Sequence, residues 1–237
     1  ADELLRTEKF QSIEEIVDDA GVELFLIGVP NPFTFQYATI MRGKQQAMMD
    51  IIEKPALVRR IIDKGTEISI NQSIAFARLG VDALYIGETF GGLIGPRFFE
   101  EFCLPPLKRF VSTLKQYHIL IYLHICGDST KLLEPMANTG VDCIEPLDPL
   151  GGVVVADAKG RVGHRVALMG GVNTISLAHG TINEVVEDCK RCIREGAPGG
   201  AYILACGITG TLSGVPPDMA ILTLSLEFIL FYPFMQL

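Results

Sequence analysis

A histidine and a cysteine two positions apart, His124 and Cys126, are the residue pair in this chain best suited to chemistry. They close an apolar run, residues 118–123, that predicts a fully buried parallel strand. Side chains alternate between the faces of a strand, so the imidazole and the thiol should point the same way. Together they would form half of a zinc site. The alternative is a buried histidine beside an unreactive core cysteine, since cysteine is often buried.

The elements that must position this pair are short apolar strands that alternate with helices six times along the chain. This pattern predicts a parallel sheet covered by helices. For the first helix, Ser12 and Glu15 predict a capping box. The expected strands are 22–29, 81–87, 118–126, 141–145, 165–169 and 201–205. The main expected helices are 12–20, 34–41, 55–79, 96–117 with a break near Pro105 and Pro106, 129–138, 181–195 and 216–230.

Two architectures fit such a sheet, an open doubly wound sheet and a (β/α)8 TIM-type barrel. No G-x-G-x-x-G motif opens a helix after a strand, which disfavours a dinucleotide-binding sheet. A barrel gathers its strand ends into one mouth, where function belongs. We therefore expect an α/β barrel, because ligand-type residues stand at nearly every strand end: Asn31, Glu88, His124, Cys126, Glu145, Asp148, Asn173 and Cys206.

Only six of the eight βα units of a barrel are recognisable, so the first two are missing from this pattern. The chain of 237 residues should still form one barrel domain over residues 1–237. Its first visible strand, 22–29, would be an exposed edge, and such edges invite pairing. We therefore expect either a homo-oligomer contact on that side or a truncated chain.

Composition excludes several other classes of protein. The net charge of −8 with no long basic run disfavours nucleic-acid binding. The charged N-terminus does not look like a signal peptide, and six cysteines without compact spacing favour a cytoplasmic protein. The apolar segment 220–237 is interrupted by Glu227 and Pro233 and is short for a membrane span, so no membrane partner is expected.

A third ligand of zinc type, Cys206, ends the last predicted strand. A catalytic zinc ion commonly has three protein ligands and one exchangeable position, which His124, Cys126 and Cys206 would supply. Glu145 is either a fourth ligand or a hydrogen-bonded carboxylate of the rim. Glu88 either anchors substrate or is a carboxylate in water.

A second cysteine motif, Cys189-x-x-Cys192, lies inside a predicted helix with no second pair nearby. Structural zinc needs four ligands, so we do not expect a metal there. The other histidines, His118, His164 and His179, are interpreted as structural.

Three segments in order resemble the uroporphyrinogen decarboxylase superfamily: GVDALYIGETFGGLIGPRFFEEFCLPPLKRF, LHICGDSTKLLEPMANTGVDCIEPLDP and VALMGGVNT. The resemblance extends over about residues 22–233. It implies a (β/α)8 barrel of which the visible strands are the third to the eighth.

Within that superfamily, His124, Cys126 and Cys206 resemble the ligands of the zinc-dependent corrinoid methyltransferases, such as methylcobalamin:coenzyme M methyltransferase. Those enzymes carry His-x-Cys after the fifth strand and a cysteine after the eighth. The Arg-rich N-terminal segment with which the decarboxylases hold a porphyrinogen is not found in this chain. The segment 206–216 differs from the coenzyme M enzymes, which leaves the methyl acceptor open.

The resemblance implies a zinc-dependent methyltransferase that moves a methyl group between a corrinoid of the cobalamin type, or a corrinoid protein, and a thiol or methyl-ether substrate. Zinc would hold the thiol as thiolate or polarise the ether. Glu88 and Glu145 would serve catalysis, and Gly170 and Asn173 would contact the corrinoid. The implied partners are a corrinoid protein and a small-molecule methyl donor or acceptor. Two alternatives stay open, a metal-free tetrapyrrole decarboxylase and a non-catalytic binding subunit.

Overall fold

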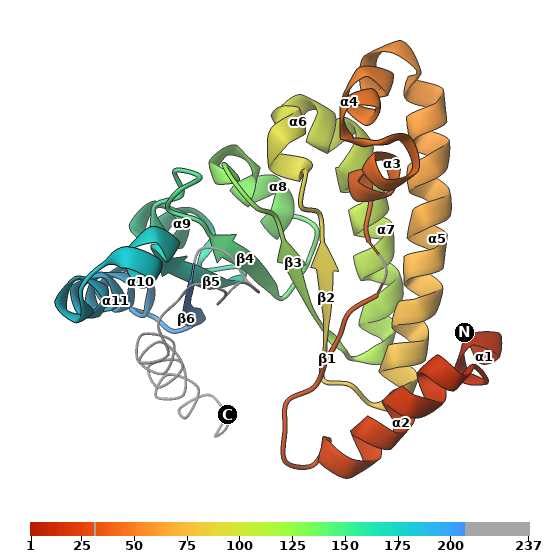
Figure 1. The fold of residues 1–237 in the computed structure, drawn as a ribbon, viewed down its shortest axis with the longest axis horizontal. Helices are drawn as coiled ribbons and strands as arrows, with labels where there is room; N and C mark the ends of the chain where they lie inside the picture. The colour runs from red at the N-terminus through yellow and green to blue at the C-terminus, as the bar shows by residue number, and fades with distance from the viewer. Residues whose placement is uncertain (31, 207–237) are drawn as a thin grey trace. The chain divides into compact units, whose positions relative to one another are not determined.

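The computed structural model describes residues 1–30 and 32–206 (Figure 1). These residues form two compact units, the first made of Ala1–His124 with Asn138–Asp142, the second of Ile125–Ala137 with Cys143 onward. Each unit holds three parallel strands and their helices, so the α/β class predicted from the sequence is confirmed. One domain over residues 1–237 stays a prediction, as does the expected helix 216–230, which lies outside the described residues.

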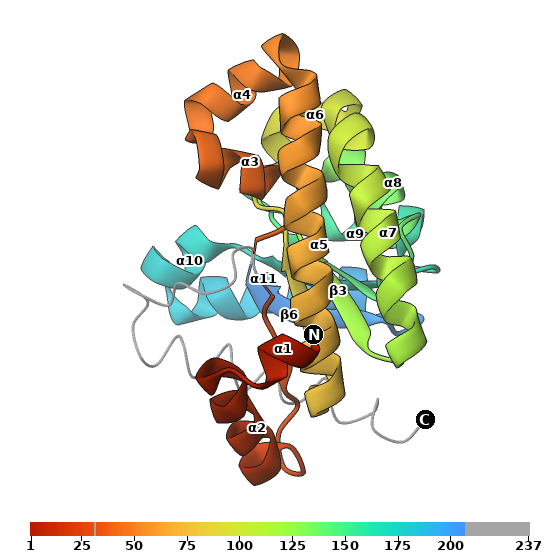
Figure 2. The ribbon, with the colours of Figure 1, turned by 90° about the vertical axis from the view of Figure 1, so that its right-hand side faces the viewer.

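The first unit contains the strands β1 (Ile27–Gly28), β2 (Ala83–Gly87) and β3 (Leu120–His124). Its helices are α1 (Asp2–Leu5), α2 (Glu8–Ala20), α3 (Phe35–Arg42), α4 (Lys44–Glu53), α5 (Pro55–Leu79), α6 (Gly91–Phe98), the π-helix η1 (Phe99–Cys103), α7 (Leu104–Leu114) and the 3₁₀ helix η2 (Lys115–Tyr117). Helices α5 and α7 run side by side along the strands in both views (Figures 1 and 2).

The long helix α5 begins and ends where the sequence predicts. Pro55 occupies its first turn, where the missing N–H is not needed. Gly80 ends it in the left-handed conformation, with φ 90°, which residues other than glycine adopt reluctantly.

The sheet of the first unit has one fully buried face. Gly28 pairs with Leu84, and a Cβ on Gly28 would lie 2.8 Å from the ring of Phe76 in α5, so this face packs on α5. Alternate residues of the strands share it, namely Leu84, Ile86, Ile121 and Leu123, each at most 1% exposed. Burying side chains of this size stabilises a fold by about 1.5–3 kcal/mol each.

The N-terminal thirty residues differ from the sequence prediction. The first long helix begins at Glu8 with Thr7 at its N-cap, so the predicted capping box of Ser12 is wrong; Ser12 lies inside the helix and its hydroxyl donates to the carbonyl of Glu8. Strand β1 is far shorter than 22–29. The side chains of Phe25, Ile27 and Val29 are 44–59% exposed, and the homo-oligomer contact expected on this side stays a prediction.

The predicted helix 96–117 is interrupted by the π-helix η1 rather than near Pro105 and Pro106. Those prolines lie in the first turn of α7, where their missing N–H groups are tolerated.

The second unit contains β4 (Cys143–Leu147), β5 (Ala167–Val172) and β6 (Tyr202–Cys206). Its helices are η3 (Thr130–Leu132), α8 (Leu133–Ala137), α9 (Val155–Val162), α10 (Thr174–His179) and α11 (Ile182–Gly196). Helix α11 begins with a capping box of Thr181 and Glu184, and its buried face carries Val185, Cys189 and Cys192. Helix α10 was not predicted.

No helix in the part of the chain that the structure describes combines the length and the apolar character needed to cross a membrane.

Candidate functional site

Several of the predicted site residues lie at or directly after the carboxyl ends of the strands in each unit. In the first unit, His124 ends β3 and Glu88 directly follows β2. In the second unit, Cys206 ends β6, Asn173 directly follows β5, and Glu145 lies within β4. Strands that run parallel end at the same edge of their sheet, where α/β proteins hold their ligands.

His124 is held through both its backbone and its ring. The N–H of Glu88 donates to the carbonyl of His124 at 2.8 Å, which joins the ends of β2 and β3. The residue as a whole is only 4% exposed. Its imidazole lies against the ring of Tyr85, with the two ring centroids 5.3 Å apart. The histidine is therefore buried and oriented by neighbours within its own unit.

Two tyrosines beside His124 were missed by the sequence analysis. Tyr85 and Tyr122 pair directly across β2 and β3, and their rings meet edge to face at 5.2 Å. Because residues two apart on a strand share a face, both tyrosines stand on the face of His124. The signal was present in the sequence as a tyrosine two positions before His124 and a tyrosine two positions before Gly87.

Glu88 is fully buried instead of standing in water, so that alternative is wrong for this residue. Its Oε2 accepts the N–H of Phe35 at 2.9 Å, at the start of α3, while Oε1 has no hydrogen-bond partner among the described residues. Burial raises the pKa of this carboxyl well above its usual range, against the lowering effect of the amides of Phe35 and Gln36. Burial therefore favours the protonated, neutral form of the Glu88 carboxyl.

The surroundings of Glu88 are buried and strained. Thr34, at the N-cap of α3, has φ 35° and ψ −115°, a conformation uncommon outside glycine, and its hydroxyl does not cap the helix. Cys103 is fully buried, and burial raises the pKa of its thiol, with a further contribution from the nearby Glu88. Glu88 thus caps helix α3, although Phe35, whose N–H it accepts, lies 53 residues earlier in the chain. Thr34, the N-cap residue of α3, makes no capping hydrogen bond with its side chain.

In the second unit, Cys126 lies two residues beyond the end of β3, in a loop, so its predicted place inside the strand is wrong. The loop is tied to β4, since the N–H of Ile125 donates to the carbonyl of Glu145 at 2.9 Å. The same loop packs closely on Gly151, in the segment after β4: a Cβ added to Gly151 would lie 2.3 Å from the carbonyl carbon of Gly127. Cys126 itself is half-buried.

Strand β4 continues to Leu147, two residues beyond its predicted end at Glu145. Glu145 is consequently an internal strand residue, 1% exposed. The loop that follows is closed by Asp148, whose Oδ1 accepts the N–H of Leu150 at 2.9 Å. A catalytic or ligand role of Glu145 stays a prediction.

The remaining site residues serve the local backbone. Gly170 has φ 127°, and a Cβ there would lie 2.4 Å from the amide nitrogen of Leu147, so only glycine fits. The Oδ1 of Asn173 accepts the N–H groups of Ile175 and Ser176 at 2.8 and 3.3 Å and so caps α10. Contact of Gly170 and Asn173 with a corrinoid stays a prediction.

The predicted metal ligands are divided between the units, His124 in the first, Cys126 and Cys206 in the second. None of the six cysteines, all of which are described, is in a disulfide. Residues 1–30 and 32–206 contain no group of three or more His, Cys, Asp or Glu side chains arranged to hold a metal ion. The set of three ligands therefore stays a prediction.

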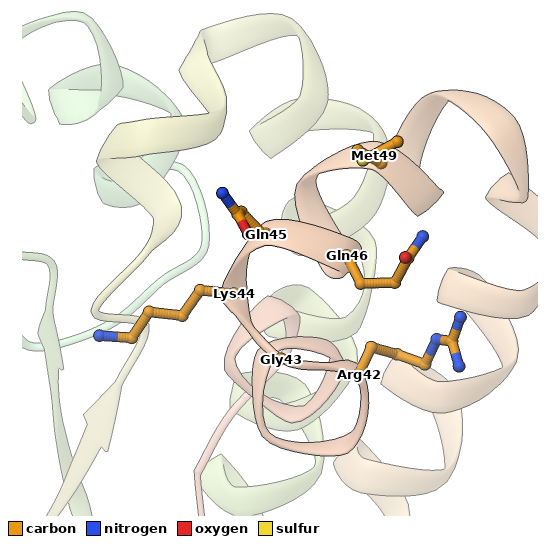
Figure 3. A pocket seen from close by; sticks show the side chains of 6 residues that line it. All are labelled: Arg42, Gly43, Lys44, Gln45, Gln46 and Met49. Atoms are coloured by element: carbon orange, nitrogen blue, oxygen red, sulfur yellow. The ribbon is translucent and has the colours of Figure 1, made fainter.

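A depression on the surface of the first unit lies over the start of α4 and is not a convergent site (Figure 3). The side chains of Lys44 and Arg42 point in opposite directions. Arg42 and Gln46 donate to the buried carboxylate of Asp50 at 2.7 and 2.8 Å, so their polar groups are engaged within the protein.

Relatives of this chain include enzymes of two kinds. It is 27% identical over 194 residues to uroporphyrinogen decarboxylase of Histophilus somni (strain 2336), covering 78% of this chain and 53% of the relative. It is 26% identical over 204 residues to methylcobamide:CoM methyltransferase MtaA of Methanosarcina barkeri, covering 84% and 57%. The chain thus spans little more than half the length of these relatives.

A solved structure, a methyltransferase from Methanosarcina mazei, has the same fold. It superposes with a TM-score of 0.77 at 22% identity, over 97% of this chain and 67% of that one. A family model described as uroporphyrinogen decarboxylase (URO-D) matches residues 8–224. Because this match covers most of the sequence, the chain belongs to the uroporphyrinogen decarboxylase family.

Proposed function

We propose that this chain is part of a zinc-dependent methyltransferase that moves a methyl group between a corrinoid and a thiol or methyl-ether substrate. The single observation that carries the proposal is the donor set, an imidazole and two thiols at or just beyond the carboxyl ends of parallel strands. Relatives of the chain include two methylcobamide:CoM methyltransferases as well as decarboxylases.

The donor set suits zinc better than it suits the hard cations magnesium and calcium. Thiolate and imidazole together favour zinc over magnesium or calcium, which prefer oxygen ligands. His124, Cys126 and Cys206 would hold the ion, with Glu145 as a candidate fourth ligand. When bound, zinc would act as a Lewis acid that holds a thiol as thiolate or polarises an ether oxygen.

The residues of the chain have their own part in this proposal. The buried backbone bond from Glu88 would keep the end of β3, and so His124, in place. The tie from Ile125 to Glu145 would do the same for the start of the loop that carries Cys126. Gly170 and Asn173 are proposed to contact the corrinoid, which would be presented by a corrinoid protein.

The experiment is a measurement of metal content and methyl transfer for the wild-type chain and Cys206→Ser. We expect one zinc ion per wild-type chain, and at least about 10-fold weaker zinc binding in the variant, with an unchanged far-UV circular dichroism spectrum. Cys189→Ser, at a buried cysteine of α11, is the matched control and should keep its zinc.

Wild-type protein that contains no zinc, binds none when it is supplied, and decarboxylates a porphyrinogen would contradict the proposal and favour the second family activity. If neither reaction occurs and this chain forms a complex with a different protein chain, the result would support the alternative of a non-catalytic binding subunit.

A further inference from the structure

The ring of His124 rests against Tyr85, a residue to which the proposed function assigns no role. The two ring centroids are 5.3 Å apart and the ring planes are inclined by 44°. Both residues belong to the first unit, and the contact is diagonal, because His124 pairs across the strands with Gly87 and not with Tyr85. Diagonal neighbours on parallel strands meet only when a long side chain leans along its strand.

Gly87 leaves the space into which Tyr85 leans. Residues two apart on a strand share a face, so a side chain at position 87 would stand between Tyr85 and His124. A Cβ on Gly87 would lie 3.2 Å from Cε1 of Tyr85 and 3.5 Å from its hydroxyl oxygen. A Cβ at position 87 would therefore press on the tyrosine ring, and a larger side chain would have to displace the ring.

A second aromatic residue supports Tyr85 from the neighbouring strand. Tyr122 pairs directly with Tyr85, and the two rings meet at 71° with centroids 5.2 Å apart. Tyr85 thus has an aromatic neighbour directly across the ladder and another, His124, two residues further along it.

The backbone of His124 is already held by the amide of Glu88, at 2.8 Å from its carbonyl oxygen. What the backbone does not fix is the rotation of the imidazole about its χ2 bond, which has a broad energy profile. A flat ring packed against the imidazole restricts that rotation. Which way the ring nitrogens point decides whether a histidine can bind a metal.

We propose that Tyr85, in the space left by Gly87, is a positioning residue that fixes the ring orientation of His124 for metal binding. The inference rests on the proposed function, because the orientation has a use only if His124 is a ligand. Loss of a residue that orients a metal-binding histidine commonly weakens metal binding by about 10- to 100-fold.

The first test compares Tyr85→Leu with Tyr85→Phe in two measurements. One is the chemical shift of the His124 ring protons in the metal-free chain, assigned with His124→Gln among the four histidines. The other is zinc affinity by competition with a chelator. Tyr85→Leu should remove the ring-current shift and weaken zinc binding about 10-fold. Tyr85→Phe keeps the ring and should retain both.

The second test leaves Tyr85 in place and displaces it. Gly87→Ala should shift the His124 signals slightly and Gly87→Val strongly, because their side chains occupy the space of the tyrosine ring. In the double variant with Tyr85→Leu, Gly87→Val should have little further effect, since the two substitutions act through one contact. The control is Phe98→Leu, a half-buried aromatic residue of α6 that packs on Phe102, and it should change neither measurement.

Unchanged His124 signals in Tyr85→Leu and in Gly87→Val would overturn the inference, even in a chain that binds zinc. Shifted signals with unchanged zinc affinity would also overturn it, because the orientation would then have no effect on binding. A wild-type chain that binds no zinc overturns the proposed function separately, and the His124 signals still decide whether Tyr85 orients the ring.

Discussion

Replacing Glu88 by glutamine tests whether its carboxyl is a neutral acid. The residue is fully buried, its Oε2 accepts the N–H of Phe35, and burial raises its pKa well above the usual 4.5. Glutamine has nearly the same shape and keeps a carbonyl oxygen for Phe35, but it does not titrate. The variant therefore isolates the effect of the proton.

The sign and the size of the effect follow from linkage. Because the folded pKa is raised, the folded chain keeps a proton that the unfolded chain releases near pH 4.5. The stability that this proton contributes is fully present below that pH and is lost as the pH rises through the folded pKa. Within this window the wild type loses up to about 1.4 kcal/mol per pH unit relative to Glu88→Gln. Between pH 5 and pH 7 the loss is up to about 3 kcal/mol.

The assay is urea unfolding followed by circular dichroism at pH 5, 6 and 7. Glu88→Leu, which also removes the acceptor for Phe35, should cost about 1–3 kcal/mol more than Glu88→Gln at every pH. The control is Asp50→Asn. Asp50 is a second buried carboxylate, but its pKa is lowered by the hydrogen bond that it accepts from Arg42. Asp50 is ionised in both states over this range, so this variant should be less stable by a constant amount.

A stability difference between wild type and Glu88→Gln that does not change with pH would refute the reasoning. It would mean that Glu88 is ionised in the folded chain at pH 5.

Two further predictions concern the second unit. Gly171→Ala should destabilise the unit by more than about 2 kcal/mol, because φ at Gly171 is 105° and the new Cβ would lie 2.6 Å from Val155. Gly160→Ala, on helix α9 where a Cβ would meet open space, should instead stabilise the unit by about 0.5–1 kcal/mol. Equal effects of the two glycine variants in urea unfolding would contradict this. Thr181→Ala removes the hydroxyl that accepts the N–H of Glu184 and should cost about 1 kcal/mol, with Thr181→Ser as the control that keeps the cap.

Local patterns in the sequence were sufficient to predict most helices and strands. Helix α5 begins at Pro55 and ends before Gly80 because each residue acts on its own backbone, through a missing N–H and a left-handed conformation. The place of His124 at a strand end followed in the same way from an apolar run that stops at Gly127. Residue types and their order also carried the family resemblance.

The environment of Glu88 could not be predicted in this way. The sequence shows a carboxylate after a strand, where water would be the ordinary surrounding. Its partner, the N–H of Phe35, is 53 residues away, and only the folding of α3 onto the end of β2 buries it. Asn173 is a similar case, because it caps a helix, α10, that was not predicted from the sequence.

The sequence by itself determined which residues could bind a metal, since an imidazole and thiols are properties of His124, Cys126 and Cys206 alone. The tertiary structure decided how the imidazole is held. The contact with Tyr85 depends on the register between β2 and β3, which sets Gly87 opposite His124. This register is fixed by packing between two segments that are far apart in the chain; the paired residues Gly87 and His124 are 37 positions apart. The residue pattern within either segment alone does not predict how the two strands align.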